Sequence, residues 1–400
     1  MKPTTTFTIQ KKTFFDAINA ASKTSLTQGQ CERLYLNPVL SAIVFSLNDY
    51  YTLSVMAAGK HRCVSTSVPL IERKGDTRDF AIMELDIYPI LRRLDDQEIK
   101  VELYEHQAVF HHSYGTFTVP LVTEGLDVFF SVFHSLEQRL CTHKVEIEAP
   151  FFHSMTRRLC RYTAQDDLRP VLAGIHIRQK AGKLDFVATD GHRLMRITKE
   201  DQECSLESSL TIQLDIIKIL RSITPRTGLI TLYYSEYNEK EADSFVCHAI
   251  IDNGADFWFI PTERKYPNYD TVTPKKSTWT LNIQRTLFKQ SLDRISLFTD
   301  LHDIIRMDTR KDSITLFGKD KDFSLQATET LPCQYQGTPM KIGIRIKNMD
   351  EILSSMKSRS VVMQGHKPFD PVIITPGEQS KDEEVTILFM PCAISDDEEE

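Results

Sequence analysis

The sequence lacks the patterns that mark membrane, secreted and metal-binding proteins. Its hydrophobic runs all fall short of the roughly 20 residues that a helix needs to cross a bilayer. Its polar, alternating first ten residues are unlike the apolar core of a secretory signal. The eight cysteines are scattered, without a Cys-x-x-Cys pair or a Cys/His cluster at zinc spacing. We therefore expect a cytoplasmic protein with reduced thiols and with neither a metal nor a cofactor.

Catalytic motifs are equally scarce. The stretch Thr189–Leu194 contains an acid, Asp190, and a base, His192, but no Ser or Cys nucleophile motif accompanies them. Asp-Gly is typical of a tight hairpin turn, where neighbouring side chains diverge. We predict that the protein is not an enzyme. The alternative is a nucleic-acid enzyme that uses Asp190 and His192, which would require a third acidic or nucleophilic partner.

An overall basic charge is also missing. The formal net charge is -7, which argues at first sight against a nucleic-acid partner. Asp396 to Glu400 contribute five of these negative charges, so the rest of the chain carries only -2. The acidic tail, residues 395–400, has no apolar side chain and is predicted to be disordered. In a nearly neutral body, the positions of the basic residues matter more than their number.

What the sequence does contain is a short pattern repeated six times. Each copy has an alternating strand with apolar residues at i and i+2, followed by an amphipathic helix with apolar residues at helical spacing. The first members of the strand pairs lie between 63 and 73 residues apart. The six pairs are Phe7/Ile9, Phe80/Ile82, Val145/Ile147, Leu210/Ile212, Trp279/Leu281 and Ile342/Ile344.

The length of the chain and the repeat together predict three domains. Four hundred residues exceed the roughly 250 to 300 that one hydrophobic core serves, and a unit of about 65 residues is marginal alone. Pairing the six units gives domains at 1–143, 144–277 and 278–394, followed by the tail. Short alternating runs between the helices predict antiparallel strands, so we expect an α+β fold of three similar domains.

Basic residues recur on the helix face opposite the buried stripe. If six such helices faced a common axis, their charges would meet phosphates without reading bases. Each basic residue taken singly is as easily part of an ordinary solvated face. The candidates for contact with DNA are Lys12, Lys23, Arg92, Arg93, Arg157, Arg158, Arg161, Lys218, Arg221, Arg285, Lys289, Lys357 and Arg359.

Three segments carry a resemblance to a known family. The first is the stretch Arg169–Gly174 together with VATDGHRL at 187–194, the second is Tyr266–Lys275, and the third is the ending Phe389–Ile394. In this order they resemble the bacterial DNA polymerase III beta subunit, the sliding clamp. The resemblance is strongest in the predicted middle domain, and it agrees with the independently found sixfold repeat.

The resemblance implies a DNA-clamp fold and a homodimeric ring, with helices lining the hole around double-stranded DNA and antiparallel sheets outside. It implies that the replicative polymerase, the clamp loader and repair proteins dock short hydrophobic peptides in a pocket between the second and third domains. Carried over by motif, the pocket residues are Leu172, Thr189, Gly191, His192, Arg193, Leu194, Pro267, Val272, Leu388, Met390, Pro391 and Cys392. Subunit contacts would involve Phe117 and Val119 with Leu297 and Phe298.

The sequence also departs from the family pattern. Thr271 stands where many clamps have an arginine, Cys392 is smaller than the usual residue, and Pro170 and Val171 replace aromatic residues of some members. The acidic tail follows the Met-Pro ending, and we expect it either to compete weakly with acidic partner peptides or to repel wrong ones. A repeat scaffold that binds only proteins, as a monomer or a filament, is the remaining alternative to the clamp.

Overall fold

A computed structural model describes residues 2–48, 51–165, 169–200, 207–235, 245–262, 265–274, 276–300, 303–320 and 323–394. The chain divides into two compact units. Unit 1 comprises Met1–Ser154 and Asp215–Glu263, and unit 2 comprises Met155–Leu214 and Arg264–Glu400. Each unit therefore contains part of the predicted middle domain; the three-domain division itself stays a prediction. The acidic tail and Cys204 lie outside the described residues, and the seven described cysteines are free thiols.

Unit 1 contains two antiparallel sheets. The five-stranded sheet has the order β5-β1-β7-β8-β9, and the eight-stranded sheet has the order β10-β15-β16-β17-β4-β3-β2-β6. The strands are β1 (Thr5–Gln10), β2 (Ala42–Leu47), β3 (Thr52–Gly59), β4 (Arg62–Pro69), β5 (Glu72–Gly75), β6 (Asp79–Met83), β7 (Glu98–Leu103), β8 (Gln107–His112), β9 (Gly115–Pro120), β10 (His143–Glu148), β15 (Leu229–Tyr234), β16 (Cys247–Ile251) and β17 (Ala255–Phe259). The helices are α1 (Lys11–Ser22), α2 (Gln28–Leu34), η1 (Pro38–Ser41), α3 (Glu84–Leu91) and α4 (Leu126–Glu137), with the start of α5 (Ala149–Leu159) and most of α6 (Leu214–Ile223).

Unit 2 has a nine-stranded sheet and a four-stranded sheet. Their orders are β14-β11-β12-β13-β26-β25-β24-β18-β22 and β21-β20-β19-β23. The strands are β11 (Gly174–Lys180), β12 (Lys183–Thr189), β13 (Arg193–Glu200), β14 (Ser208–Gln213), β18 (Trp279–Gln284), β19 (Ile304–Arg310), β20 (Ser313–Asp320), β21 (Leu325–Pro332), β22 (Gln334–Gln336), β23 (Lys341–Arg345), β24 (Ser360–Gly365), β25 (Val372–Pro376) and β26 (Glu384–Phe389). The helices are α7 (Arg285–Ile295), η3 (Ser296–Phe298) and α8 (Ile346–Ser355).

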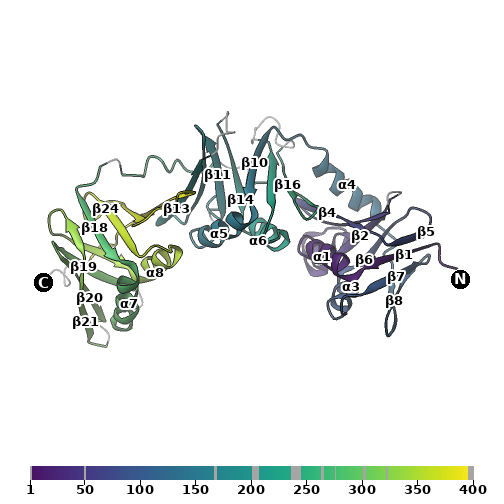
Figure 1. The fold of residues 1–400 in the computed structure, drawn as a ribbon, viewed down its shortest axis with the longest axis horizontal. Helices are drawn as coiled ribbons and strands as arrows, with labels where there is room; N and C mark the ends of the chain where they lie inside the picture. The colour runs from purple at the N-terminus through teal and green to yellow at the C-terminus, as the bar shows by residue number, and fades with distance from the viewer. Residues whose placement is uncertain are drawn as a thin grey trace. The chain divides into compact units, whose positions relative to one another are not determined.

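All six predicted strand-helix copies are present, which confirms the α+β fold. The pairs are β1–α1, β6–α3, β10–α5, β14–α6, β18–α7 and β23–α8, and both apolar members of every strand pair are buried. Each helix turns an apolar stripe toward a sheet, as Ile216, Leu220 and Ile223 do in α6. Helices α1 and α3 lie side by side in unit 1, and α7 and α8 do so in unit 2 (Figure 1).

One antiparallel ladder in each unit joins strands of different predicted domains. In unit 1, β17 pairs with β4, with Ala255 opposite Thr66 and Phe259 opposite Arg62. In unit 2, β13 pairs with β26, with Arg193 opposite Phe389 and Thr198 opposite Glu384. At each of these two places, backbone hydrogen bonds therefore join one predicted domain to the next. Neither strand of the pair has an open edge there.

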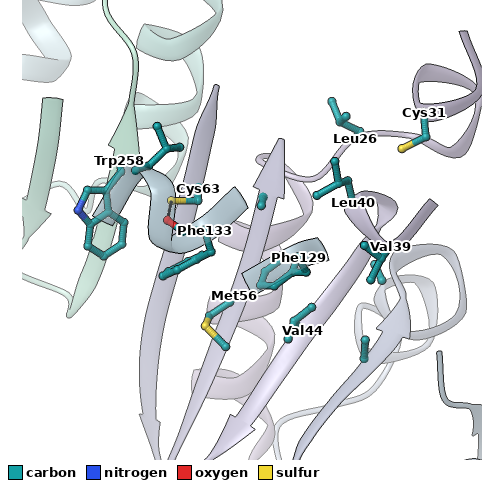
Figure 2. Packing of buried hydrophobic residues seen from close by; sticks show 14 of the residues in the cluster. Leu26, Cys31, Val39, Leu40, Val44, Met56, Cys63, Phe129, Phe133 and Trp258 are labelled. Carbon is teal, nitrogen blue, oxygen red and sulfur yellow. Dashed lines mark hydrogen bonds between the residues drawn. The ribbon is translucent and has the colours of Figure 1, made fainter. Parts of the chain in front are cut away.

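Helix α4 is the main element that the sequence analysis did not predict, since it lies outside the sixfold pattern. Its Phe129, Phe133 and Leu136 are buried in a cluster with residues of the eight-stranded sheet such as Met56 and Trp258 (Figure 2). Strand alternation places this cluster on the sheet face opposite α1. Val44 points into the α4 cluster, whereas the next residue, Phe45, packs on Phe14 of α1 with ring centroids 5.9 Å apart.

We predict that Phe133→Ala destabilises unit 1 by about 3 to 5 kcal/mol, because the change opens a cavity between Phe129 and Trp258. Urea unfolding followed by fluorescence would measure this in a Trp279→Phe background, in which Trp258 is the only tryptophan. The matched control is Leu140→Ala, whose side chain is 83% exposed. Equal unfolding midpoints for the two variants would contradict the packing of α4 on this sheet.

Candidate functional site

The turn between β12 and β13 is built around the carboxylate of Asp190. Its Oδ1 accepts hydrogen bonds from the backbone N–H groups of His192 and Arg193, each at 2.9 Å, and its Oδ2 accepts from Arg193 Nε at 3.0 Å. Gly191 has φ of 91°, a left-handed conformation that favours glycine. Both oxygens of Asp190 are therefore engaged in holding the turn, and His192 is left exposed.

Arg193 is buried and connects three segments of unit 2. Besides Asp190, its guanidinium pairs with Glu351 of α8 at 2.6 Å and donates to the carbonyl oxygen of Arg161 at 2.9 Å. It also lies over the ring of Tyr162. Burial lowers the pKa of Arg193, but the bonds to Asp190 and Glu351 outweigh that effect and raise it. Arg193, a predicted pocket residue, is thus buried and holds the turn in place, and its contact with a partner peptide stays a prediction.

An apolar cluster lies beside this turn. Leu172, Leu194 and Leu388, all predicted pocket residues, are brought together with Val187, Tyr266 and other buried residues. The three leucines are 8%, 7% and 5% exposed, so they form a floor that is nearly covered. The predicted residues Pro267, Val272, Met390 and Gly191 are exposed, and Thr189, Pro391 and Cys392 are half-buried.

Two backbone contacts fix the C-terminal end of the chain beside the turn. The N–H of Met390 donates to the carbonyl of His192 at 3.1 Å, which ties the end of β26 to the start of β13. Cys392 forms an antiparallel bridge with Gly343 of β23. A Cβ at Gly343 would overlap the carbonyl oxygen of Cys392, so this approach requires glycine. The Met-Pro segment is therefore held between two elements of unit 2.

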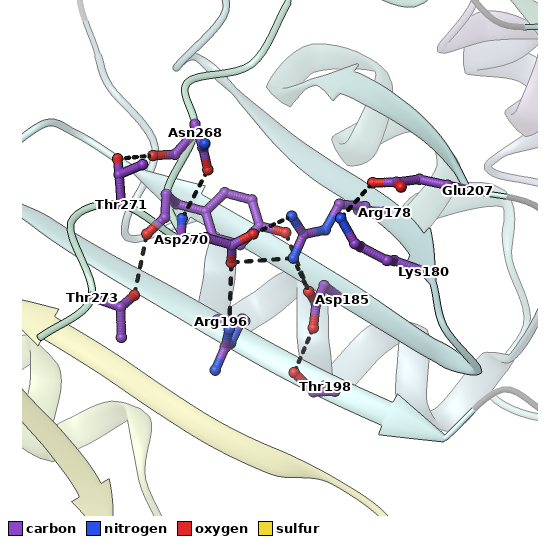
Figure 3. A network of polar contacts seen from close by, with 11 residues as sticks. Arg178, Lys180, Asp185, Arg196, Thr198, Glu207, Asn268, Asp270, Thr271 and Thr273 are labelled. Atoms are coloured by element: carbon purple, nitrogen blue, oxygen red, sulfur yellow. Dashed lines mark hydrogen bonds and ion pairs between the residues drawn. The ribbon is translucent and has the colours of Figure 1, made fainter. Parts of the chain in front are cut away.

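A polar network holds the segment 266–273 against the nine-stranded sheet (Figure 3). Arg178 of β11 donates to Asp270 at 2.7 Å and to Asp185 of β12 at 2.8 Å, and its guanidinium lies 4.5 Å from the centroid of the Tyr269 ring. The bond from Arg178 lowers the pKa of Asp270. Tyr269 donates to Asp185 at 3.2 Å. These supporting residues could not be predicted from the sequence, because their pairing depends on strand register.

Thr271 belongs to the same segment, at the position where the resemblance would place an arginine. Its hydroxyl donates to the carbonyl of Asn268 at 2.7 Å (Figure 3). The side chain therefore closes a local turn.

His176 lies beneath Tyr266, and their rings are stacked with centroids 4.4 Å apart. Its Nδ1 lies 3.0 Å from the hydroxyl of Thr211. Burial, followed by the charge of Arg178, lowers the pKa of His176 to about 3. A neutral histidine is thus part of the support for the segment that carries Pro267 and Val272.

A polar cleft of about 580 Å³ adjoins the turn. Its charged and ionisable lining, among the described residues, consists of His192, five cationic side chains and the carboxylates of Asp190 and Glu351. The cations are Arg161, Arg169, Arg193, Arg345 and Lys347. Arg161 is a predicted DNA contact and Arg193 a predicted pocket residue, whereas neither Arg169 nor Arg345 is a predicted site residue.

The predicted DNA-facing residues fall into two groups. Exposed side chains are Lys12, Arg92, Arg93, Arg157, Arg161, Lys218, Lys357 and Arg359, with Lys23 and Arg221 half-buried. The other three have partners within unit 2. Arg158 forms a bidentate pair with Glu383 at 2.7 and 2.8 Å, Lys289 pairs with Asp350, and Arg285 donates to the carbonyls of Ser358 and Leu353. These three stabilise the fold, and their contact with DNA stays a prediction.

The predicted subunit-contact residues lie at two places. Phe117 and Val119 are on β9, which ends the five-stranded sheet. Phe117 stacks on Phe110, and Val119 is only 3% exposed, so both side chains face the core of unit 1. A partner subunit could therefore contact β9 through the open backbone edge of this strand. In unit 2, η3 carries the exposed Leu297 and the half-buried Phe298.

Two further observations concern other classes of site. Among the described residues, no group of three or more His, Cys, Asp or Glu side chains is placed to hold a metal ion. In the same part of the chain, no helix is long and apolar enough to cross a membrane.

Comparison with known proteins supports the resemblance found in the sequence. Residues 270–393 match the family model for the C-terminal domain of the DNA polymerase III beta subunit. The chain is 23% identical over 242 residues to the beta sliding clamp of Synechococcus elongatus, covering 58% of this chain and 60% of that relative. It is 22% identical over 370 residues to the beta sliding clamp of Haemophilus influenzae, and this match covers 89% of this chain and 93% of that relative.

Solved structures confirm the fold. A DNA polymerase sliding clamp of Pseudomonas aeruginosa matches 98% of this chain and 100% of its own, with a TM-score of 0.84 and 17% identity. The DNA polymerase III beta subunit of Thermotoga maritima matches the same shares with a TM-score of 0.80 and 17% identity. The predicted DNA-clamp fold is therefore correct, and so is the resemblance to the beta subunit family.

The lowered pKa of His176 gives a pH dependence. Between its ordinary pKa of 6.5 and about 3, the unfolded chain binds a proton that the folded chain does not, so stability falls as the pH falls. We predict that the native protein loses about 1.4 kcal/mol more unfolding free energy than His176→Gln between about pH 7.5 and about pH 5.5. Urea unfolding of unit 2 at the two pH values measures this difference in the free energy of unfolding. The control is His192→Gln, because the His192 side chain is exposed. Identical losses in all three proteins would contradict a buried, neutral His176.

Proposed function

Because the chain has the sliding-clamp fold and its residues 270–393 match a DNA polymerase III beta subunit domain, we propose that it is a DNA sliding clamp. Such a protein closes a ring around duplex DNA and keeps a polymerase on it, without catalysing a reaction itself. The observation that carries the proposal is the sixfold strand-helix repeat, in which every helix follows a strand whose two apolar residues are buried.

The basic residues suit contact with DNA of any sequence. Lys and Arg contacts to phosphates carry no base information, and they weaken as salt rises. Exposed basic residues occur on or directly after α1, α3, α5, α6 and α8. With a charge of -2 apart from the tail, the body would be retained on DNA by its closed topology more than by affinity.

A ring requires a second copy of the chain. The free edge of β9 in unit 1 can accept a further strand, because its outer N–H and C=O groups have no neighbour in the described sheet. The apolar residues Leu297 and Phe298 of unit 2 are the complementary candidates. We propose a head-to-tail homodimer that uses these two surfaces.

Partner proteins would dock at the apolar cluster beside the Asp190 turn. Leu172, Leu194 and Leu388 form its floor. Val272 and Met390, which follow the cluster residues Tyr269 and Leu388 along the chain, are exposed. Leu and Phe side chains of a short peptide could bury apolar area there at about 25 cal/mol per Å². The proposed ligands are peptide motifs of the replicative polymerase, the clamp loader and repair proteins, in the cytoplasm.

Solution scattering with absolute mass tests the ring directly, on the purified chain alone. We expect twice the 46.0 kDa chain mass and the distance distribution of a hollow particle. A monomer that persists at high concentration, or a filament, would contradict the clamp and favour a scaffold that binds only proteins.

A labelled peptide with adjacent Leu and Phe anchors tests the pocket. We predict that His192→Ala and Met390→Ala each weaken its binding about tenfold, which corresponds to about 1.4 kcal/mol, and leave stability unchanged because both side chains are exposed. Fluorescence anisotropy measures the affinity. The control is Phe323→Ala, an exposed apolar residue of unit 2 beyond β20. Similar affinities for all three variants would place peptide docking elsewhere.

A further inference from the structure

Among its described lining residues, the polar cleft beside the Asp190 turn has more cationic than acidic side chains, and both of these acids already have partners. Five described cationic side chains line it against two described carboxylates. Asp190 is held by two backbone N–H groups and by Arg193, and Glu351 pairs with Arg193 at 2.6 Å. Neither carboxylate is therefore available to neutralise the remaining cations.

Three of those cations are available to a ligand. Arg161, Arg345 and Lys347 are exposed, and none forms an ion pair with another described residue. A further acid, Asp303, is partly buried and accepts a hydrogen bond from the backbone N–H of Lys347 at 2.7 Å. The charges of Arg345 and Lys347 act on Asp303 without a direct ion pair, so both the guanidinium and the ammonium group keep free donors. The buried Nη1 of Arg193 also has no hydrogen-bond partner among the described residues. This combination fits a ligand with several carboxylates.

The chain itself carries such a ligand, and it leaves the described structure close to this cleft. Residues 395–400 have the sequence Ser-Asp-Asp-Glu-Glu-Glu, with five carboxylate side chains. Cys392 is bridged to Gly343, and the Ile394 side chain lies against Gly343. Gly343 precedes Arg345 by two residues on β23, a distance of about 7 Å along a strand. Six residues can span up to roughly 20 Å, so the carboxylates can reach Arg345 and Lys347.

We infer that the acidic C-terminal segment 395–400 binds in the cleft of its own chain, with its carboxylates on Arg345, Lys347 and Arg161. Each contact is solvent-exposed and individually weak. Several contacts on a short tether nevertheless act together, because the tether supplies an effective concentration in the millimolar range. The segment is thus a displaceable occupant of the cleft, and its binding weakens as salt rises.

This occupancy has a consequence that rests on the proposed function. His192 and Arg193 border both the cleft and the proposed peptide pocket. A partner peptide that carries acidic residues beside its Leu and Phe anchors would have to displace the tail, whereas a peptide without acids would not. The tail would therefore select among partners by their charge.

The direct test uses a fluorescein-labelled peptide of the tail sequence and a chain that ends at Ile394. The peptide should bind this shortened chain, and the double variant Arg345→Ala/Lys347→Ala should bind it about fivefold more weakly. The intact chain should bind it more weakly than the shortened chain, because the cleft is occupied. The matched control is Lys367→Ala/Lys381→Ala, which removes two exposed positive charges of the same unit.

A second measurement tests whether the tail binds within its own chain. Carbodiimide joins a carboxylate to a contacting lysine amine with loss of water, so the intact protein should yield an amide between Lys347 and the tail. Lys347→Arg keeps the charge and should abolish this product. Mixing labelled and unlabelled protein separates products within one chain from products between two chains.

The outcomes are distinct. Equal peptide binding by the shortened chain and its Arg345/Lys347 double variant overturns the cleft as the binding site. Cross-links found only between two chains overturn the arrangement within one chain. Neither experiment uses DNA or a partner protein, so a negative result would overturn the proposal for the tail without affecting the clamp proposal. Conversely, a monomeric chain in scattering would leave the tail result unaffected.

Discussion

The backbone ladder between β13 and β26 is the interaction on which the candidate site depends. It pairs residues 193–198 with residues 384–389 and so joins segments that lie almost two hundred positions apart in the sequence. Through it, Leu194 comes directly opposite Leu388, and the Asp190 turn comes beside the Met-Pro ending. Each backbone polar group in this ladder would be costly to leave buried and unpaired. The apolar floor therefore exists only where this pairing forms.

Buried charges reinforce that ladder. Arg193 links the turn to α8 through Glu351, and Arg178 links the segment 266–273 to the sheet through Asp270 and Asp185. Breaking such a pair leaves an uncompensated buried charge, which costs more than the pair itself contributes. These arginines consequently fix the geometry of the site. The proposed peptide contacts, such as His192 and Met390, are instead exposed.

Charge is unevenly distributed along this chain, so its net charge does not describe its individual surfaces. A protein with a formal charge of -7 still has a cleft with several available cations and exposed basic residues on or beside most of its repeated helices. The acidic tail accounts for most of the negative excess and begins next to that cleft. Exposed charges act over about 10 Å at moderate salt, so their placement matters within one site and not across the whole chain.

The six strand-helix copies and the α+β class could be predicted from the sequence, because apolar spacing at periods of 2 and 3.6 is a local property of the chain. Family-like segments added the predicted pocket residues, of which Leu172, Leu194 and Leu388 do come together. Three features could be seen only in the folded chain: α4 covers the second face of the eight-stranded sheet, Arg193 is buried, and Arg158, Arg285 and Lys289 have internal partners. Burial and ion pairing depend on which distant strands align, and no local pattern encodes that register.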